Sequence, residues 1–492
     1  MKILLIYPET PSTFWSFRHA LKFVSLRSSE PPLGLLTVAA MLPEHWEKKL
    51  IDMNVSRLTD KQIRWADYVF LSGMDVHRQA FQALIRRCKA LGAKIVAGGP
   101  MVTTDYVQFP GVDHFVLNEA EITLPLFLRD LEAGCPQHIY STDQFPDIAQ
   151  TPVPLWRLLD MKKYAAMSIQ YSRGCPFNCE FCSVTQLNGH QARTKSAAQF
   201  LHELDTLYTA GWRGNVFIVD DNFIGNKRLL KSDLLPALIA WSQAHRHPYT
   251  FTTEVSINLA DDEELVRLLV QAGMRTVFVG IETPNAASLA ECGKAQNLQR
   301  DIVTSVKKLQ RSGLMVHGGF IVGFDNDPHT IFEDQIRFIQ KSGIVTAMVG
   351  LLTALSGTHL FRRLKSENRL LDHSTGNNMD GSLNFEPKMN RQKLLEGYKS
   401  VLNTIYSQKA YYERVTTFLR EYHLPQQGVF KVTWRDIRAF FRSIWKLGVL
   451  ENGRRYYWKL LLYTLWNCPK KFSLTVMLAI YGFHFRRVIE SV

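Results

Sequence analysis

The sequence predicts an α/β protein in which two units of alternating strands and helices are followed by a mainly helical C-terminal part. Short apolar segments of strand length alternate with helical patterns over residues 1–140 and again over residues 161–355, which is typical of parallel sheets. Residues 141–160 contain three prolines and are predicted to be a linker, and residues 356–492 follow a helical pattern. A chain of 492 residues is too long for one hydrophobic core, so we expect separate domains.

The first unit is predicted to form a doubly wound parallel sheet. Its expected strands are Lys2–Tyr7, Lys49–Ile51, Tyr68–Ser72, Lys94–Ala97 and His114–Leu117, and its clearest helices are Leu35–Leu42 and Phe81–Leu91. Sheets of this kind bind ligands at the carboxyl ends of their strands. The residues at these ends are Ser72, Gly73, Met74, Gly98, Gly99, Pro100, Asn118 and Glu119. Glycines there let the backbone approach a large ligand, but for this unit taken alone simple turn formation is the favoured explanation.

The second unit repeats the pattern with six expected strands. They are Ala166–Tyr171, Asn215–Val219, Thr250–Val255, Thr276–Ile281, Met315–Val322 and Val345–Leu351. Polar residues gather where four of them end: Asp220, Asp221 and Asn222, then Glu254, then Glu282, then Asp325 beside Gly323. A single carboxylate in such a place is often only a helix cap or a surface charge. Four polar clusters at four strand ends indicate a site along one edge of the sheet.

Three cysteines follow the first strand of this unit with the spacing C-x3-C-x2-C: Cys175, Cys179 and Cys182. Three thiolates at this spacing can hold three corners of a [4Fe-4S] cube and leave one iron without a protein ligand. An open metal position is what a catalytic site needs. The alternative is a zinc site with His190 as a fourth ligand, although the two uneven gaps differ from the paired C-x2-C pattern of structural zinc.

The cysteine run, with Phe181 as the aromatic residue before its last cysteine, resembles the cluster loop of the radical S-adenosylmethionine (SAM) enzymes. The resemblance implies a partial (β/α)6 barrel and a free iron that binds SAM, which one electron cleaves to a 5′-deoxyadenosyl radical. It implies an external electron donor of the flavodoxin or ferredoxin type. It also assigns SAM to Phe181, Asp220, Asp221, Glu254, Glu282, Gly319, Ile321 and Gly323. The family often has a glutamate three residues after the last of these glycines, where this chain has Asn326.

The first unit resembles the Rossmann-like cobalamin (B12)-binding domain that precedes many radical SAM domains. The matching segments are Pro31–Ala40, Leu71–Met74, Val96–Pro100 and Asn118–Glu121. The D-x-H-x-x-G motif that supplies a histidine to cobalt in other B12 domains is absent, so the resemblance implies cobalamin without a histidine below the metal. It assigns the strand-end residues Ser72 to Met74, Gly98 to Pro100, Asn118 and Glu119 to cobalamin. His77 lies near a strand end, and we expect a polar surface residue rather than a ligand.

The C-terminal part is basic and rich in aromatic residues. The net charge of the chain is +13, and residues 431–492 hold twelve Lys and Arg against three acidic residues, which is nine of these charges. This excess indicates a local anionic partner. Phe472–Phe485 is an apolar run of fourteen residues, too short to span a bilayer, which fits either a membrane interface or a buried helix. Tyr411–Val415 and Glu396–Ser400 resemble the C-terminal domain of the subgroup that includes a hopanoid methylase.

Together these features predict a cobalamin-dependent radical SAM methyltransferase that acts on an unactivated carbon, with a lipid-like or otherwise hydrophobic substrate as one option. The same cofactors could serve an oxidation or a cyclisation, and a non-enzymatic iron–sulfur or cobalamin carrier or sensor is a further alternative. A methylthiotransferase acting on tRNA would need an additional cluster, for which Cys88 and Cys135 are too few, and nucleic acid is not expected as a partner. The N-terminus lacks a signal peptide pattern, and the unpaired cysteines fit a reducing cytoplasm, with peripheral membrane contact as an option.

Overall fold

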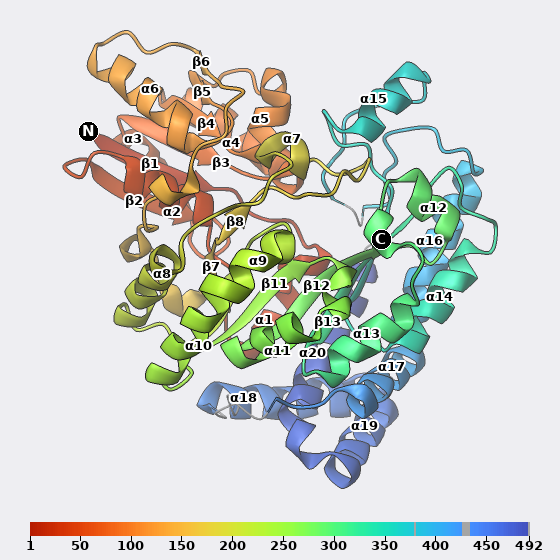
Figure 1. Ribbon diagram of the computed structural model, residues 1–492. Helices are drawn as coiled ribbons and strands as arrows, with labels where there is room; N and C mark the ends of the chain where they lie inside the picture. The colour runs from red at the N-terminus through yellow and green to blue at the C-terminus, as the bar shows by residue number, and fades with distance from the viewer. Residues whose placement is uncertain (378–379, 426–432, 491–492) are drawn as a thin grey trace.

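The computed structural model describes residues 1–377, 380–425 and 433–490. It contains two six-stranded parallel sheets and a group of C-terminal helices, so the predicted fold class is confirmed. Figure 1 shows the first sheet at the upper left in red and orange, the second in the centre in green, and the C-terminal helices at the lower right in blue.

The first sheet has the strand order β2-β1-β3-β4-β5-β6, and all neighbours are parallel. Its strands are β1 (Lys2–Tyr7), β2 (Glu47–Asp52), β3 (Tyr68–Ser72), β4 (Lys94–Gly98), β5 (His114–Val116) and β6 (Ile139–Tyr140). Its main helices are α2 (Leu33–Met41), α3 (Asp60–Trp65), α4 (Arg78–Ala90), α5 (Pro100–Asp105) and α6 (Ala120–Glu132). Alternate residues of β1 enter two separate cores, Leu4 and Ile6 on one face and Ile3 and Leu5 on the other, because successive strand side chains point to opposite faces. Helices therefore cover both faces, as predicted.

The second sheet keeps its strands in sequence order, β7-β10-β11-β12-β13-β14, all parallel, as in a partial barrel. The strands are β7 (Ala166–Ile169), β10 (Gly214–Ile218), β11 (Tyr249–Val255), β12 (Met274–Glu282), β13 (Met315–Val322) and β14 (Ala347–Leu351). The longer helices between them are α8 (Ala197–Thr209), α10 (Leu235–Ala244), α11 (Glu263–Ala272), α13 (Ile302–Arg311) and α14 (Ile331–Ser342). The carboxyl ends of all six strands therefore lie along one edge.

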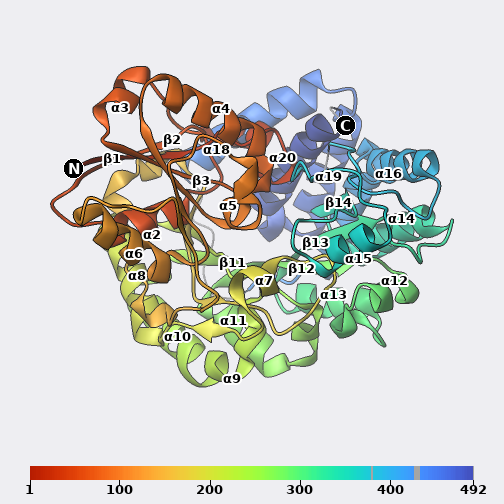
Figure 2. The ribbon, with the colours of Figure 1, turned by 90° about the horizontal axis from the view of Figure 1, so that it is seen from above.

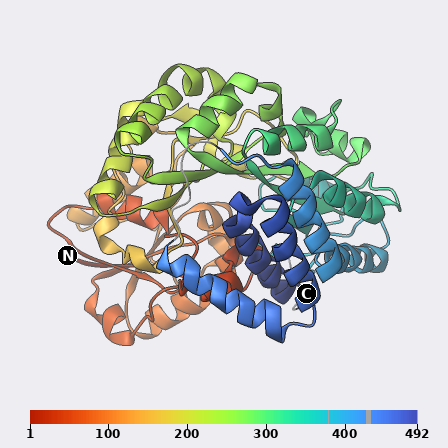
Figure 3. The same cartoon turned by 90° about the horizontal axis from the view of Figure 1, so that it is seen from below.

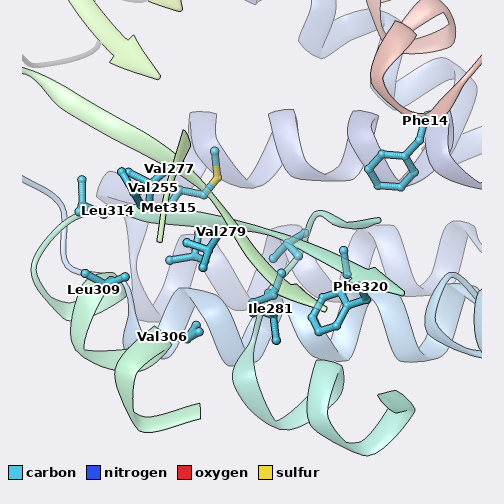
Figure 4. Packing of buried hydrophobic residues seen from close by; sticks show 14 of the residues in the cluster. Phe14, Val255, Val277, Val279, Ile281, Val306, Leu309, Leu314, Met315 and Phe320 are labelled. Carbon is cyan, nitrogen blue, oxygen red and sulfur yellow. The ribbon is translucent and has the colours of Figure 1, made fainter. Parts of the chain in front are cut away.

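The core of the second unit lies on the helix side of the sheet. Figure 4 shows Val277, Val279 and Ile281 of β12 on the same side as Val306 and Leu309 of α13. The opposite face of the sheet is only half-buried. On β11 burial alternates at every residue, and Thr250, Thr252 and Glu254 keep accessible surface.

The C-terminal helices pack against the end of the barrel and also against the N-terminal segment. They are α15 (His359–Ser366), α16 (Arg391–Ile405), α17 (Gln408–Glu421), α18 (Trp434–Ser443), α19 (Arg454–Asn467) and α20 (Phe472–Ile489), with a π-helical segment at Ile444–Leu450. The N-terminal helix α1 (Arg18–Val24) contacts α18 and α20. Phe14, just before α1, stacks on Phe485 of α20 with ring centroids 4.1 Å apart. Figures 2 and 3 show the three parts arranged around one another.

Candidate active site

The cysteine loop runs from the end of β7 to the start of α8, and a small hairpin closes its base. β8 (Ser172–Arg173) pairs antiparallel with β9 (Arg193–Thr194). Gly174 has a φ of 96°, and a Cβ at this position would clash with a carbonyl oxygen of the facing chain. Only glycine therefore fits directly before Cys175. The sequence did not predict this hairpin, because two-residue strands are too short to show a pattern.

Asp220 follows β10, and its carboxylate is buried against the start of the cysteine loop. It accepts hydrogen bonds from the Tyr171 N–H at 2.8 Å and from the Ser172 N–H and hydroxyl at 2.7 and 2.6 Å. Burial raises the pKa of Asp220 to about 7, although these bonds act to lower it. Both carboxylate oxygens of Asp220 are hydrogen-bonded to the cysteine loop. The predicted contact of Asp220 with SAM therefore stays a prediction. Its neighbour Asp221 accepts one hydrogen bond from Asn188 at 3.1 Å.

The three cysteines do not converge on a single point. Within the described residues no three His, Cys, Asp or Glu side chains are placed to hold one metal ion, and His190 is exposed. The structure therefore gives no support to the zinc alternative. A cube of four irons distributes three thiolates over three different irons, which suits thiols that are set apart. The donor set thus fits a [4Fe-4S] cluster with one open iron.

The surroundings of the cysteines combine burial with one cation. Burial raises the pKa of all three thiols, that of Cys182 to about 12, so cluster binding must displace their protons. The Nζ of Lys294 lies 2.6 Å from Oε1 of Glu282. Burial acts to lower the pKa of Lys294, but the charges of Glu282 and Cys179 raise it, so the ammonium stays charged. A buried cation here favours thiolates and other anionic groups.

Residues of β13 and of the turn after it contact β12 and the cysteine loop. Gly319 lies so close to β12 that a Cβ would stand 2.7 Å from the Phe278 ring. Ile321 is half-buried, and the N–H of Gly323 donates to Asp327 at 2.8 Å. Sequence reasoning missed Asp327, because it lies one position beyond Asn326, where the family's acidic residue was sought. Phe181 of the loop packs on Phe324, with ring centroids 6.3 Å apart.

Asp325 was predicted among the polar residues at this edge, but its carboxylate points to the C-terminal part. It pairs with Arg363 at 2.8 Å and with Arg369 at 2.7 Å. Burial acts to raise the pKa of Asp325, yet the hydrogen bonds from both arginines hold it at about 2. Arg363 also binds Glu180 of the cysteine loop at 2.6 Å. Asp325 therefore fastens the loop through α15.

One carboxylate on the half-buried face of the second sheet, and a second that interacts with it, have no hydrogen-bond partners among the described residues. Glu254 lies in one cross-strand row with Phe278 and His317. Glu30 comes from the first unit and interacts electrostatically with Glu254. Burial raises the pKa of Glu254 to about 8, with the charges of Asp221 and Glu30 adding to it, and burial raises that of Glu30 to about 7.

An aromatic residue from the N-terminal segment covers part of this face. The indole of Trp15 donates to the Met348 sulfur at 3.0 Å and packs edge-on against Phe278, with ring centroids 5.5 Å apart. It also lies over the ring of His317, whose Nε2 is buried without a partner in the described structure. Burial lowers the pKa of His317 to about 4, so this histidine is neutral. Sequence reasoning missed Trp15, because its partners lie hundreds of residues away.

At the edge of the first sheet, the predicted cobalamin residues come together. Gly98 ends β4, and Gly73 and Asn118 follow the neighbouring strands β3 and β5, beside the half-buried Ser72 and the exposed Met74 and Pro100. Gly99 has a φ of 97°, and a Cβ there would clash with the Ser72 hydroxyl, so turn geometry by itself requires this glycine. Met74 and Pro100 are exposed apolar residues at this edge, where a large ligand can contact them.

The side chain of Glu119, predicted to contact cobalamin, forms ion pairs with the second unit. Its carboxylate pairs with Arg173 at 2.6 Å and with Arg193 at 2.6 Å, and Arg173 also binds Glu121 at 2.8 Å. Both arginines belong to the hairpin at the base of the cysteine loop. Glu119 therefore joins the two units, and its contact with cobalamin stays a prediction.

The expectation that His77 is a surface residue is wrong. Its side chain is completely buried. Its Nδ1 accepts a hydrogen bond from the Met74 N–H at 3.1 Å, and its Nε2 lies 3.0 Å from the Thr10 hydroxyl. Burial lowers the pKa of His77 to about 4. Both ring nitrogens are engaged, so His77 serves to position the strand end.

Comparisons with known proteins agree with this site. The model of the radical SAM superfamily matches residues 169–339, that of the B12 binding domain matches 23–128, and a domain of unknown function, DUF4070, matches 358–492. An uncharacterized methyltransferase of Synechocystis sp. is 41% identical over 100% of this chain and 92% of its own length. The hopanoid C-2 methylase of Rhodopseudomonas palustris is 31% identical over 94% of this chain and 89% of its own length.

Two solved structures share the fold. TsrM from Kitasatospora setae, with cobalamin and a [4Fe-4S] cluster bound, has a TM-score of 0.66 at 14% identity and covers 100% of this chain and 99% of its own. The cobalamin-dependent SAM radical enzyme OxsB has a TM-score of 0.64 at 15% identity, covering 100% of this chain and 80% of its own. The chain thus belongs to the cobalamin-binding radical SAM methyltransferases with a C-terminal DUF4070 domain, a family whose cofactors are a [4Fe-4S] cluster, SAM and cobalamin.

Proposed function

We propose that the protein methylates an unactivated carbon of a hydrophobic, lipid-like substrate. The observation that carries this proposal is the half-buried face of the second sheet. Apolar side chains of Trp15, Phe278 and Met348 lie there near two carboxylates without partners in the described structure, Glu30 and Glu254. Such a surface suits a ligand that is mostly apolar and has a polar group to orient it. The hopanoid C-2 methylase, a relative over nearly the whole chain, supports a substrate of this class.

We propose a domain division in which each of the first two domains holds its own cofactors. Residues 1–140 would hold cobalamin, and residues 161–355 would hold the cluster and SAM, with 141–160 as linker and 356–492 as the C-terminal domain. The cluster ligands would be Cys175, Cys179 and Cys182. When bound, the cofactors supply the radical that removes a hydrogen atom from the substrate and the methyl group that replaces it. Enzymes of this family need a reductant, for which we propose a flavodoxin or ferredoxin.

The side chains of the chain have positioning work to do rather than proton chemistry at the reacting carbon. Glu30 and Glu254 repel one another when both are charged, which favours a state in which at least one keeps its proton near neutral pH. A protonated carboxyl donates a hydrogen bond, and a carboxylate accepts one. The pair can therefore hold a substrate hydroxyl in one orientation, while Trp15 helps to exclude water.

The test is a search for a methylated lipid. The anaerobically reconstituted enzyme is incubated with dithionite, SAM that carries a trideuterated methyl group, and a total lipid extract of the source organism. We expect mass spectrometry to find one lipid in which a trideuteromethyl group has replaced hydrogen on a carbon. Labelled water-soluble products without any labelled lipid would contradict the proposed substrate class and leave the methyl transfer itself in place.

A second candidate keeps the same cofactors but ends in oxidation or cyclisation. The anaerobic magnesium-protoporphyrin IX monomethyl ester cyclase of Cereibacter sphaeroides is 24% identical over 74% of this chain, which favours keeping this alternative. A reaction of that kind would yield 5′-deoxyadenosine together with an unmethylated, oxidised product.

A further inference from the structure

Large apolar side chains are exposed on one part of the molecule far more than elsewhere. Of the seventeen exposed large hydrophobic residues in the described structure, ten lie between residues 434 and 466. Trp434 and Trp466 are each 84% exposed, and Phe441 and Trp445 are each 63% exposed. Tryptophan is rarely left this open on a soluble protein unless its surface has a partner.

These residues form stripes along two helices and the segment between them. Trp434, Ile437 and Phe441 are spaced by three and four residues on α18, and Trp445 and Val449 continue the stripe. On α19 the stripe consists of Trp458, Leu462, Leu465 and Trp466. This spacing places each stripe on one side of its helix.

The other side of each helix is packed into the protein. Ala439 and Leu447 are buried behind the first stripe, and Leu460 and Leu461 behind the second. The indole of Trp458 donates to the Gly448 carbonyl oxygen at 2.9 Å, which joins the two stripes. We call the ten exposed residues the tryptophan face. Figure 1 shows α18 and α19 together at the lower edge of the molecule, and Figure 3 shows α18 in the foreground.

Basic residues lie on and beside the helices of the tryptophan face. Those that are exposed and have no carboxylate partner in the described structure are Arg435, Arg438, Arg442, Arg454, Arg455, Lys459 and Lys470. The acidic residues of the described segment 433–490 are all hydrogen-bonded to, or paired with, residues of the same segment. Asp436 caps α18 by accepting from Thr433, and Glu451 and Glu490 both pair with Arg487. An excess of unpaired positive charge, which we call the cationic rim, therefore lies among and beside the apolar stripes.

The apolar helix α20 is packed inside the protein and is not part of the exposed apolar surface. Pro469–Ile489 is long and apolar enough to cross a membrane, with a mean hydropathy of 1.2 over an eighteen-residue stretch, but 61% of that stretch is buried. Phe485 stacks on Phe14, and the hydroxyl of Tyr411 donates to the Leu478 carbonyl oxygen at 2.6 Å. The buried-helix interpretation of Phe472–Phe485 is therefore confirmed, and the interfacial one is wrong for this segment.

We propose that the tryptophan face docks onto the surface of an anionic lipid bilayer. Tryptophan side chains prefer the headgroup level of a membrane, and Lys and Arg are attracted to anionic lipids there. Amphipathic helices with this division of residues lie in the plane of the interface. A second copy of the chain fits less well, because two cationic rims would face each other. The inference rests on the proposed lipid-like substrate, which a membrane-bound enzyme would meet at the bilayer.

The test measures binding of the full-length, cofactor-loaded protein to vesicles. Co-sedimentation is compared between pure phosphatidylcholine vesicles and vesicles that also contain phosphatidylglycerol, at low and high salt. We expect at least tenfold tighter binding to the anionic vesicles, weakened by salt, and a blue shift of tryptophan fluorescence on binding. Equal binding to both vesicle types, or none to either, would overturn the proposal.

Two sets of variants localise the contact. The triple variant Trp434→Ser, Trp445→Ser and Trp466→Ser, and the triple variant Arg435→Gln, Arg438→Gln and Lys459→Gln, should each bind anionic vesicles at least tenfold more weakly. The matched control carries Val107→Ser and Leu371→Ser, two exposed apolar residues elsewhere, and should bind like the unaltered chain. Iron and cobalamin contents equal to those of the unaltered protein show that each variant is folded.

Other partners of the tryptophan face would give results different from vesicle binding. Dimerisation in light scattering that the tryptophan variant abolishes, or RNA binding that displaces the vesicles, would overturn the bilayer as the partner. Vesicle binding needs no substrate, so its failure is separable from failure of the proposed methylation. If the protein methylates a lipid but does not bind vesicles, only the proposed docking to the bilayer is refuted.

Discussion

The buried carboxylate of Asp220 holds the first residues of the cysteine loop through three hydrogen bonds. Asparagine has the same size but one acceptor oxygen, so Asp220→Asn would leave a buried loop N–H without a partner. We expect the free energy of unfolding of the cofactor-free protein to fall by about 1–3 kcal/mol. We also expect less iron to bind on reconstitution. Anaerobic urea unfolding and an iron assay measure the two effects.

Asp221 provides the matched control for this change. It is adjacent in sequence, yet its carboxylate accepts a single side-chain hydrogen bond, from Asn188. Asp221→Asn should therefore change the free energy of unfolding less than Asp220→Asn does. Equal losses in both variants would show that the loop does not depend on the Asp220 contacts.

Cys179 is the most buried of the three predicted cluster cysteines, with 8% of its surface exposed. Replacing it with alanine would remove one of the three proposed thiolate ligands, and we expect Cys179→Ala to form no 5′-deoxyadenosine from SAM. Cobalamin should still bind, because its predicted residues lie in the first sheet. Cys135→Ala, at an exposed free cysteine, is the control and should keep full activity. Deoxyadenosine formation by the Cys179 variant would refute the assigned role of the cysteine loop.

Glu254 and Glu30 make the stability of the cofactor-free protein depend on pH. Burial raises the pKa of these carboxyls to about 8 and about 7, so the folded protein holds protons that the unfolded chain has released. Stability is therefore fully present below the unfolded pKa of about 4.5 and is lost as pH rises toward 8. One pKa unit equals about 1.4 kcal/mol, and water at this half-buried face reduces the effect, so we expect roughly 1–2 kcal/mol.

Thermal or urea unfolding between pH 5 and about 8 tests this pH dependence. The double variant Glu30→Gln and Glu254→Gln should be more stable than the unaltered chain at the high end of that range and should show a flatter profile. Glu413→Gln, at an exposed position on α17, should leave the profile unchanged. An identical slope in the double variant would assign the pH dependence to other groups.

At the scale of elements, the hairpin of β8 and β9 connects the cysteine loop to the first unit. Glu119 at the start of α6 binds an arginine on each strand of the hairpin, and all three side chains are largely buried. Glu119→Gln removes the charge that balances them. We expect a loss of about 3 kcal/mol or more in the free energy of unfolding, because a buried charge then lacks its partner. Chemical unfolding measures it, with Glu132→Gln at the exposed end of α6 as control.

The strands were predictable because each sheet buries apolar segments of the length and spacing that parallel strands require. The predicted strands Lys2–Tyr7, Tyr68–Ser72 and Met315–Val322 agree with β1, β3 and β13 residue for residue. Ser196 caps the helix after the cysteine loop, because its hydroxyl accepts from the Gln199 N–H at 3.2 Å. The side chain of Gln199 donates to two linker carbonyls, a contact that no local sequence pattern shows.

The sequence could show which residues lie at strand ends but not what their side chains contact. Asp220, Glu119 and Asp325 all lie where they were expected. The residues that they contact belong to other elements, however. Only the tertiary structure therefore shows that these carboxylates hold the cysteine loop in place. Glu254 was recognised as a strand-end carboxylate. Glu30 belongs to no motif, so its proximity to Glu254 is evident only from the folded structure, where the two units meet.

At the scale of the whole molecule, the N-terminal segment ties all three parts together. Phe14 packs into the C-terminal helices while the next residue, Trp15, packs on the half-buried face of the second sheet. The arginine pairs of Glu119 make a second connection between the first two units. This arrangement places the edges predicted to bind cobalamin and SAM within one folded body.

We propose that one active site uses SAM both as a radical source and as a methyl donor. The decisive experiment is one anaerobic reaction of the reconstituted enzyme with cobalamin, SAM, dithionite and lipid extract, in which the products are quantified together. We expect 5′-deoxyadenosine, S-adenosylhomocysteine and a methylated lipid in equal amounts. Deoxyadenosine that accumulates with an oxidised lipid, and with neither S-adenosylhomocysteine nor a methylated lipid, would refute the proposal.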